Sequence, residues 1–193
     1  SDDASGARTD EGSVVFATVR DLQVEGYVPP YLTFCVGITV DLNCSSANGS
    51  FIALGELSKT NANTGTSQYS GATNDPGGFS TSMSGTTMTS GTNIIPPMST
   101  PQSSTPGTSQ FGVNLRANSN PSVGQNRTGS GSSTARPDYN SPNVFKFASQ
   151  VISNSNLPTN FNRFTVSYLV NVSNAQPPGV YSATLTYIAV AAF

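Results

Sequence analysis

Short runs in which hydrophobic and polar residues alternate recur along most of the chain, and this spacing predicts β-strands. In the last run, Tyr181, Leu185 and Tyr187 fall on one face and Ser182 and Thr184 on the other. Clusters of Gly, Pro, Asn and Ser separate the runs, as is typical of turns. Further candidate strands lie at 14–24, 32–36, 51–56, 79–83, 111–115, 145–147 and 164–168.

No run has the 3.6-residue spacing and capping residues of an amphipathic helix. The pattern therefore predicts an all-β fold: an antiparallel β-sandwich of about 8–10 strands, either a jelly roll or an immunoglobulin-like pilin fold. Residues 91–110 and 117–144 are low in complexity and longer than ordinary connections. We expect them to be long polar loops on the outer surface.

The end of the last strand breaks the alternation, because every residue from Ile188 to Phe193 is apolar. A strand that is apolar on both faces is expected where protein covers both faces. In a small two-layer sandwich the core covers only one face of a strand. The other face of the last strand would therefore be covered by a loop or by a neighbouring subunit. For the second case we predict an acceptor groove lined by Tyr187, Ile188, Val190 and Phe193.

The N-terminal part divides into a tail and a strand. Residues 1–12 carry four of the ten acidic residues and almost nothing apolar, which predicts a flexible tail. Residues 13–25 form a candidate strand that could complement a neighbour's sheet, and residues 26–193 form the single sandwich domain. In the other interpretation, residues 13–19 are the first strand of their own sandwich. The candidate donor side chains are Val14, Val15, Phe16, Val19, Leu22 and Val24.

Charge is scarce: charged residues make up 9% of the chain, against roughly 25% in an ordinary soluble domain. The net charge is −2 and the eight basic residues are scattered, so we expect no nucleic-acid partner. No apolar run is long enough for a membrane-spanning helix. The polar start resembles the N-terminus left after a signal peptide is removed, which predicts an extracellular or cell-surface location.

The two cysteines, Cys35 and Cys44, lie nine positions apart. An even count in an exported chain favours a disulfide. Closing this loop would stabilise the fold by roughly 2.5–3 kcal/mol on the chain-entropy model. The chain has no histidine, and two thiolates do not complete a zinc shell, so we predict neither a metal nor a cofactor.

Candidate catalytic residues are few, because the absence of histidine removes the commonest general base. A two-carboxylate glycosidase would have to use Asp41, Glu56, Asp75 or Asp138, and the three aspartates lie in turn-like sequence. We therefore predict no catalytic site and a protein that is not an enzyme.

Modification chemistry offers two further candidates. Lys146, between two phenylalanines in strand spacing, is predicted to face water, which argues against a buried lysine crosslink. The sequons at Asn48 and Asn126 are candidate glycosylation sites.

Four segments resemble a family of secreted β-sandwich surface proteins of ultrasmall candidate-phylum bacteria. They are "LTFCVGITVDLNCSS", "SGTTMTSGTNIIP", "GTSQFGVNLRAN" and "FTVSYLVNVSNAQPPGVYSATLTYIAVAAF". The resemblance spans residues 31–193 and implies a fold and a surface location. The terminal strand is also similar in character to those of donor-strand pilins of the chaperone–usher and spore-coat types.

Together these features predict a structural subunit of an extracellular, pilus-like filament for surface attachment. Its partner would be a second copy, bound head to tail by strand complementation. The alternative is a monomeric secreted or surface adhesin that binds glycans or a host cell through its long loops.

Overall fold

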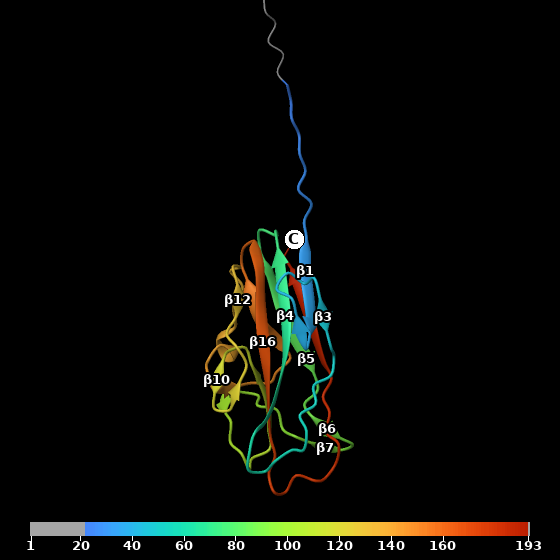
Figure 1. The fold of residues 1–193 in the computed structure, drawn as a ribbon, viewed down its shortest axis with the longest axis vertical. Coiled ribbons are helices and arrows are strands. Elements are labelled where there is room, and N and C mark those ends of the chain that lie inside the picture. Colours follow the sequence, from blue (N-terminus) through green and yellow to red (C-terminus); the bar gives the residue numbers. More distant parts are fainter. Residues whose placement is uncertain (1–21, 193) are drawn as a thin grey trace, which may run out of the picture.

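Two antiparallel β-sheets pack face to face in the computed structural model, which describes residues 22–192 (Figure 1). The predicted all-β sandwich is therefore confirmed. The first sheet has the order β1-β4-β16-β12, with β9 also paired to β16. Its strands are β1 (Leu32–Gly37), β4 (Asn63–Thr73), β9 (Gln110–Asn114), β12 (Thr128–Gly129) and β16 (Thr159–Asn171).

The second sheet has the order β13-β15-β5-β17. Its strands are β5 (Phe79–Gly85), β13 (Thr134–Ala135), β15 (Gln150–Ser155) and β17 (Leu185–Ala191). Two-residue strands form small ladders outside the two sheets: β2 (Thr39–Val40), β3 (Ala47–Asn48), β6 (Thr89–Ser90), β7 (Asn93–Ile94), β8 (Gln102–Ser103), β10 (Asn118–Ser119), β11 (Ser122–Val123) and β14 (Val144–Phe145). One 3₁₀ turn, η1, spans Pro137–Tyr139.

The main core lies between the two sheets. Tyr69 of β4 stacks on Phe164 of β16 with ring centroids 5.1 Å apart. The Tyr69 hydroxyl reaches across the core and donates to Ser153 Oγ of the second sheet at 2.8 Å. Met83 of β5 and Ile152 of β15 are fully buried opposite them. The inward side chains of the central strands therefore leave no room between the sheets.

A third layer covers the outer face of the first sheet. Leu169 of β16 points away from the main core and packs with Met98 and Phe145 in a second buried cluster. Residues 164–171 of β16 are consequently all buried. The stretches expected as open loops thus carry short strands and hydrophobic anchors, and part of each packs against the sandwich.

Asparagine side chains hold this layer together where hydrophobic contacts are few. Buried Asn114 donates from its amide nitrogen to the carbonyls of Ser141 and Val144, at 2.8 and 2.6 Å. Its amide oxygen accepts from the backbone N–H of Arg116 and from the side chain of Asn118. Buried backbone N–H and C=O groups need hydrogen-bond partners. Here side-chain amides supply the partners that a neighbouring strand would supply in a larger sheet.

The Cys35–Cys44 disulfide is present, as predicted, with the two Cα atoms 5.6 Å apart. It joins β1 to the turn between β2 and β3. Within residues 22–192, no helix has the length and apolar character needed to cross a membrane.

Candidate subunit-docking edge

One side of the sandwich is formed by two edge strands, β1 of the first sheet and β17 of the second, which lie side by side. Among the described residues, β1 pairs only with β4, and β17 pairs only with β5. Each strand therefore has a second edge with no ladder partner. Unpaired edges are templates for the addition of another strand. We call this side, made of β1 and β17, the open edge.

Core-facing side chains at the open edge are incompletely covered. Phe34 and Val36 of β1 fall on the same face as the buried Tyr69, because the β1–β4 register places Val36 opposite Tyr69. Tyr69 is 1% exposed, whereas Val36 is 41% exposed and Phe34 is half-buried. On β17, Leu185 and Tyr187 pack against the core cluster but are likewise only half-buried. The core is thus only partly covered along this side.

Tyr187 takes part in a hydroxyl chain at the open edge. Its hydroxyl lies 2.6 Å from that of Tyr168, which in turn lies 2.8 Å from Ser67 Oγ. Burial raises the pKa of Tyr187 well above its usual value, and the neighbouring Tyr168 hydroxyl adds to that shift. Both phenols therefore remain neutral and serve as hydrogen-bonding groups.

The other predicted groove residues of β17 lie on its outer face. Ile188 and Val190 are 48% and 56% exposed, and they stand opposite Ser82 and Ser80 of β5. Tyr187 faces the core instead, so the three side chains do not share one surface. Phe193 lies outside the described residues. The two apolar faces of β17 thus differ: the face with Leu185 and Tyr187 is half-buried against the core, and the face with Ile188 and Val190 is exposed.

The segment that precedes β1 is extended and makes little contact with the sandwich. Residues 22–30 form no strand and are all exposed, and Figure 1 shows this segment leading away from the sandwich along its long axis. Leu22 and Val24, two of the six predicted donor side chains, are each 88% exposed. The other four, Val14, Val15, Phe16 and Val19, lie outside the described residues.

Asn74 fixes the direction in which this segment leaves. Its amide oxygen accepts from the backbone N–H of Tyr31 at 2.8 Å, and its amide nitrogen donates to the carbonyl of Pro29 at 2.9 Å. The Thr73 hydroxyl donates to the Tyr31 carbonyl at 2.7 Å. Because Pro29 and Pro30 also have restricted backbone angles, the chain enters β1 in a straight line.

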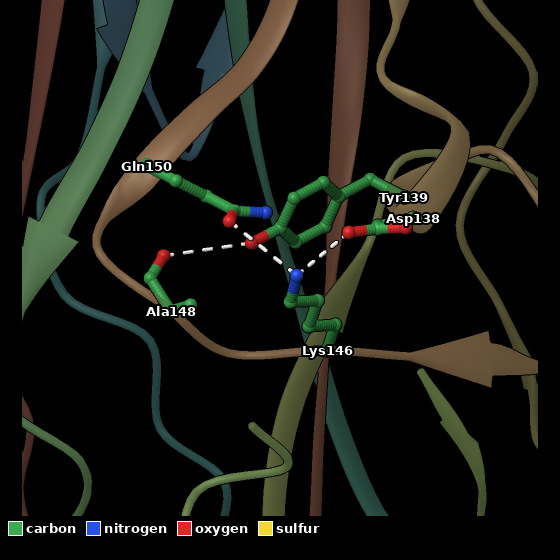
Figure 2. Close-up of polar contacts among 5 residues, drawn as sticks. All are labelled: Asp138, Tyr139, Lys146, Ala148 and Gln150. Carbon is green, nitrogen blue, oxygen red and sulfur yellow. Dashed lines mark hydrogen bonds and ion pairs between the residues drawn. The ribbon is translucent and has the colours of Figure 1, made fainter. Parts of the chain in front are cut away.

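A polar cluster surrounds Lys146, whose backbone pairs with Val113 of β9 in the first sheet (Figure 2). Its ammonium lies 2.6 Å from Asp138 Oδ2 and 3.4 Å from Gln150 Oε1. The Lys146 side chain is 12% exposed, so the expectation that it faces water was wrong: the 3₁₀ turn folds over it and supplies Asp138. The hydrogen bond from Lys146 lowers the pKa of Asp138, which keeps the pair ionic.

The four carboxyl groups considered for catalysis occupy separate surroundings. Asp41 accepts hydrogen bonds from Ser45 and Ser46, which lower its pKa, while Glu56 is exposed. Buried Asp75 caps its own turn by accepting from the N–H of Gly77. A glycosidase general acid requires a raised pKa, so the lowered values of Asp41 and Asp138 do not suit that role.

A shallow depression of about 700 Å³ lies on the outer face of the second sheet. Its lining includes the polar side chains Ser80, Asn154, Arg136 and Asp138 and the apolar side chains Phe79, Val151 and Val190. Within residues 22–192, no three His, Cys, Asp or Glu side chains come close enough together to hold a metal ion.

The two candidate glycosylation sites, Asn48 and Asn126, are both exposed. Asn126 also accepts a hydrogen bond from the Ala117 N–H at 3.2 Å.

Comparison with family models, with curated proteins and with solved structures found no match for this chain.

Proposed function

We propose that this protein is a structural subunit of an extracellular, pilus-like filament that serves surface attachment. In the filament, residues 13–25 of one copy would add a strand to the open edge of the next copy. Two observations carry the proposal: residues 22–30 are extended and expose apolar side chains, and one side of the same sandwich is only partly covered. A segment that points away from its own domain supplies to a neighbour what the neighbour's open edge lacks.

Strand addition suits the chemistry of both surfaces. The unpaired N–H and C=O groups of an edge strand bind any extended backbone, and alternate side chains then fill the core. Moving Leu22 and Val24 from water into a neighbour would contribute roughly 1.5–3 kcal/mol each. Because a copy that donates its own segment still offers its own open edge, the contact repeats without closing and produces a filament. The disulfide and the low charge favour an oxidising, extracellular setting.

Negative-stain electron microscopy of the purified chain, beside a variant that lacks residues 1–25, tests the proposal. We expect filaments from the full chain and folded monomers from the truncated variant. Circular dichroism shows whether the truncated variant is folded. Filaments from both proteins would refute strand complementation by this segment, and monomers from both would refute the filament.

Point variants separate the apolar contacts from mere loss of chain. Val24→Asp places a charge on an apolar donor position, whereas Gln23→Asp places the same charge on its polar neighbour. We expect Val24→Asp to reduce filament formation strongly and Gln23→Asp to leave it close to that of the unchanged chain. Equal effects from the two variants would contradict insertion of Val24 into an apolar site.

The depression on the outer face of the second sheet favours a second candidate function, a glycan-binding surface module. Its amide, hydroxyl and charged side chains can bind sugar hydroxyls, and its apolar side chains can pack against sugar rings. Glycan-array binding by the truncated monomer, abolished by Asn154→Ala, would support this function. It does not require filaments.

A further inference from the structure

The directions of the strands at the open edge determine how an incoming segment can run. β1 begins at Leu32, which is paired with Thr73 at the end of β4, and β17 ends at Ala191, which is paired with Phe79 at the start of β5. The turn 74–78 joins β4 to β5 at this same end of the sandwich. β1 and β17 therefore run in opposite directions, and the N-terminal segment joins the domain where β17 finishes.

We infer that residues 13–25 of a second copy lie along the open edge with residue 13 nearest Ala191 and residue 25 nearest Leu185, so that the segment pairs antiparallel with β17. The inference rests on the proposed function. Residues 22–30 of the donor copy leave in line with its own β1, held by Asn74 and the two prolines. In a head-to-tail filament whose copies share one orientation, that segment reaches the neighbour from the opposite end. It then runs parallel to the neighbour's β1 and antiparallel to its β17.

Sheet chemistry favours β17 as the strand that the incoming segment pairs with. All ladders of the second sheet are antiparallel, so a segment beside β17 continues the sheet as its fifth strand. Antiparallel ladders are slightly more stable per residue than parallel ones. The partly exposed inward side chains of β17, Leu185, Tyr187, Ala189 and Ala191, would then gain cover on the core side.

The same geometry distinguishes a second copy from the chain's own segment. To reach its own open edge, the segment would have to reverse at Pro29 and Pro30 and break both hydrogen bonds to Asn74. Once reversed, it would run parallel to β17. The direction of the inserted strand thus reports which copy it comes from.

Appending a second copy of residues 13–25 after Phe193 of the full chain tests the direction. A strand antiparallel to β17 starts beside Ala191, so a four-residue linker suffices to fold it back as a hairpin. A strand parallel to β17 starts beside Leu185. A linker to that point must first span the length of β17, about 20 Å at roughly 3.4 Å per residue, which four residues do not cover.

We expect the four-residue version to fill its own open edge, form no filaments and unfold at a temperature several degrees higher. A matched control carries the same linker and a segment whose apolar residues are serines, and it should still form filaments. If only a linker of about fifteen residues blocks filaments, the direction is opposite and the inference is wrong. If neither linker blocks them, the segment does not occupy this edge. If the unchanged chain forms none, the proposed function itself fails.

Discussion

Four of the seven tyrosines carry hydroxyls whose pKa is raised by burial, and this predicts a steep loss of stability in alkali. They are Tyr69, Tyr139, Tyr168 and Tyr187. Burial raises the pKa of Tyr139 to about 12, and the pKa values of the other three also lie above their usual range. The unfolded chain ionises each phenol near pH 10, whereas the folded protein does not.

The sign follows from proton linkage. Above about pH 10 the unfolded state binds fewer protons than the folded state, so the free energy of unfolding falls as pH rises toward the folded-state pKa. At pH 11, one unit above the usual value, a tyrosine that stays neutral in the folded protein lowers the free energy of unfolding by about 1.4 kcal/mol. The four together lower it by at most about 5–6 kcal/mol, the limit reached when all four stay neutral in the folded protein at pH 11; the whole stability of a typical domain is about 5–15 kcal/mol.

Urea unfolding at pH 8, 10 and 11, followed by circular dichroism, measures this loss, and absorbance near 295 nm reports ionised tyrosine. Tyr139→Phe should reduce the loss by up to about a quarter, at modest cost at pH 8, since its hydroxyl donates a long, 3.5 Å hydrogen bond to the Ala148 carbonyl and also interacts with Gln150. Tyr27→Phe, at an exposed position, is the control and should change nothing. Full ionisation of all seven tyrosines in a protein that stays folded would refute the reasoning.

Three further predictions concern the disulfide, Asn114 and the Lys146–Asp138 ion pair. Replacing Cys35 and Cys44 by serine should lower the free energy of unfolding by roughly 2.5–3 kcal/mol, and an unchanged urea midpoint would show that the disulfide adds nothing. Asn114→Ala leaves buried backbone groups without partners and should cost about 2–4 kcal/mol, measured in the same way; a loss below half a kilocalorie would contradict the network. Lys146→Met should raise the pKa of Asp138, which carboxyl NMR measures. It should also remove the part of the stability loss at low pH that comes from protonation of the Asp138 carboxylate. An unchanged Asp138 titration would show that the ion pair does not form in solution.

Much of the sandwich could be read from strand alternation, because a core face and a solvent face impose a period of two. The disulfide was also predictable, since the two cysteines had no other use. The third layer was harder to see, because Leu169 was the one apolar side chain on the outer face of its strand segment "RFTVSYLVNV". That residue was the available signal.

The asparagine network could not have been predicted from the pattern. An asparagine in a polar stretch bonds equally well to water, to its own turn or to a distant backbone, and the sequence does not distinguish these partners. Only the approach of Ser141 and Val144 to Asn114 decides the matter. For the candidate site, the sequence indicated that Ile188 and Val190 need a cover, but not that Tyr187 would face the core.

The hydrogen bonds of the asparagine side chains in the outer layer have a consequence for how the protein's stability depends on salt concentration. Its contacts join neutral amides, hydroxyls and backbone groups, and Lys146–Asp138 is the single ion pair among residues 22–192. Dissolved salt screens the attraction between exposed charges, with a screening length of about 10 Å at 0.1 M. It has little effect on hydrogen bonds between neutral groups. A fold built in this way should keep nearly the same unfolding temperature from dilute buffer to concentrated sodium chloride.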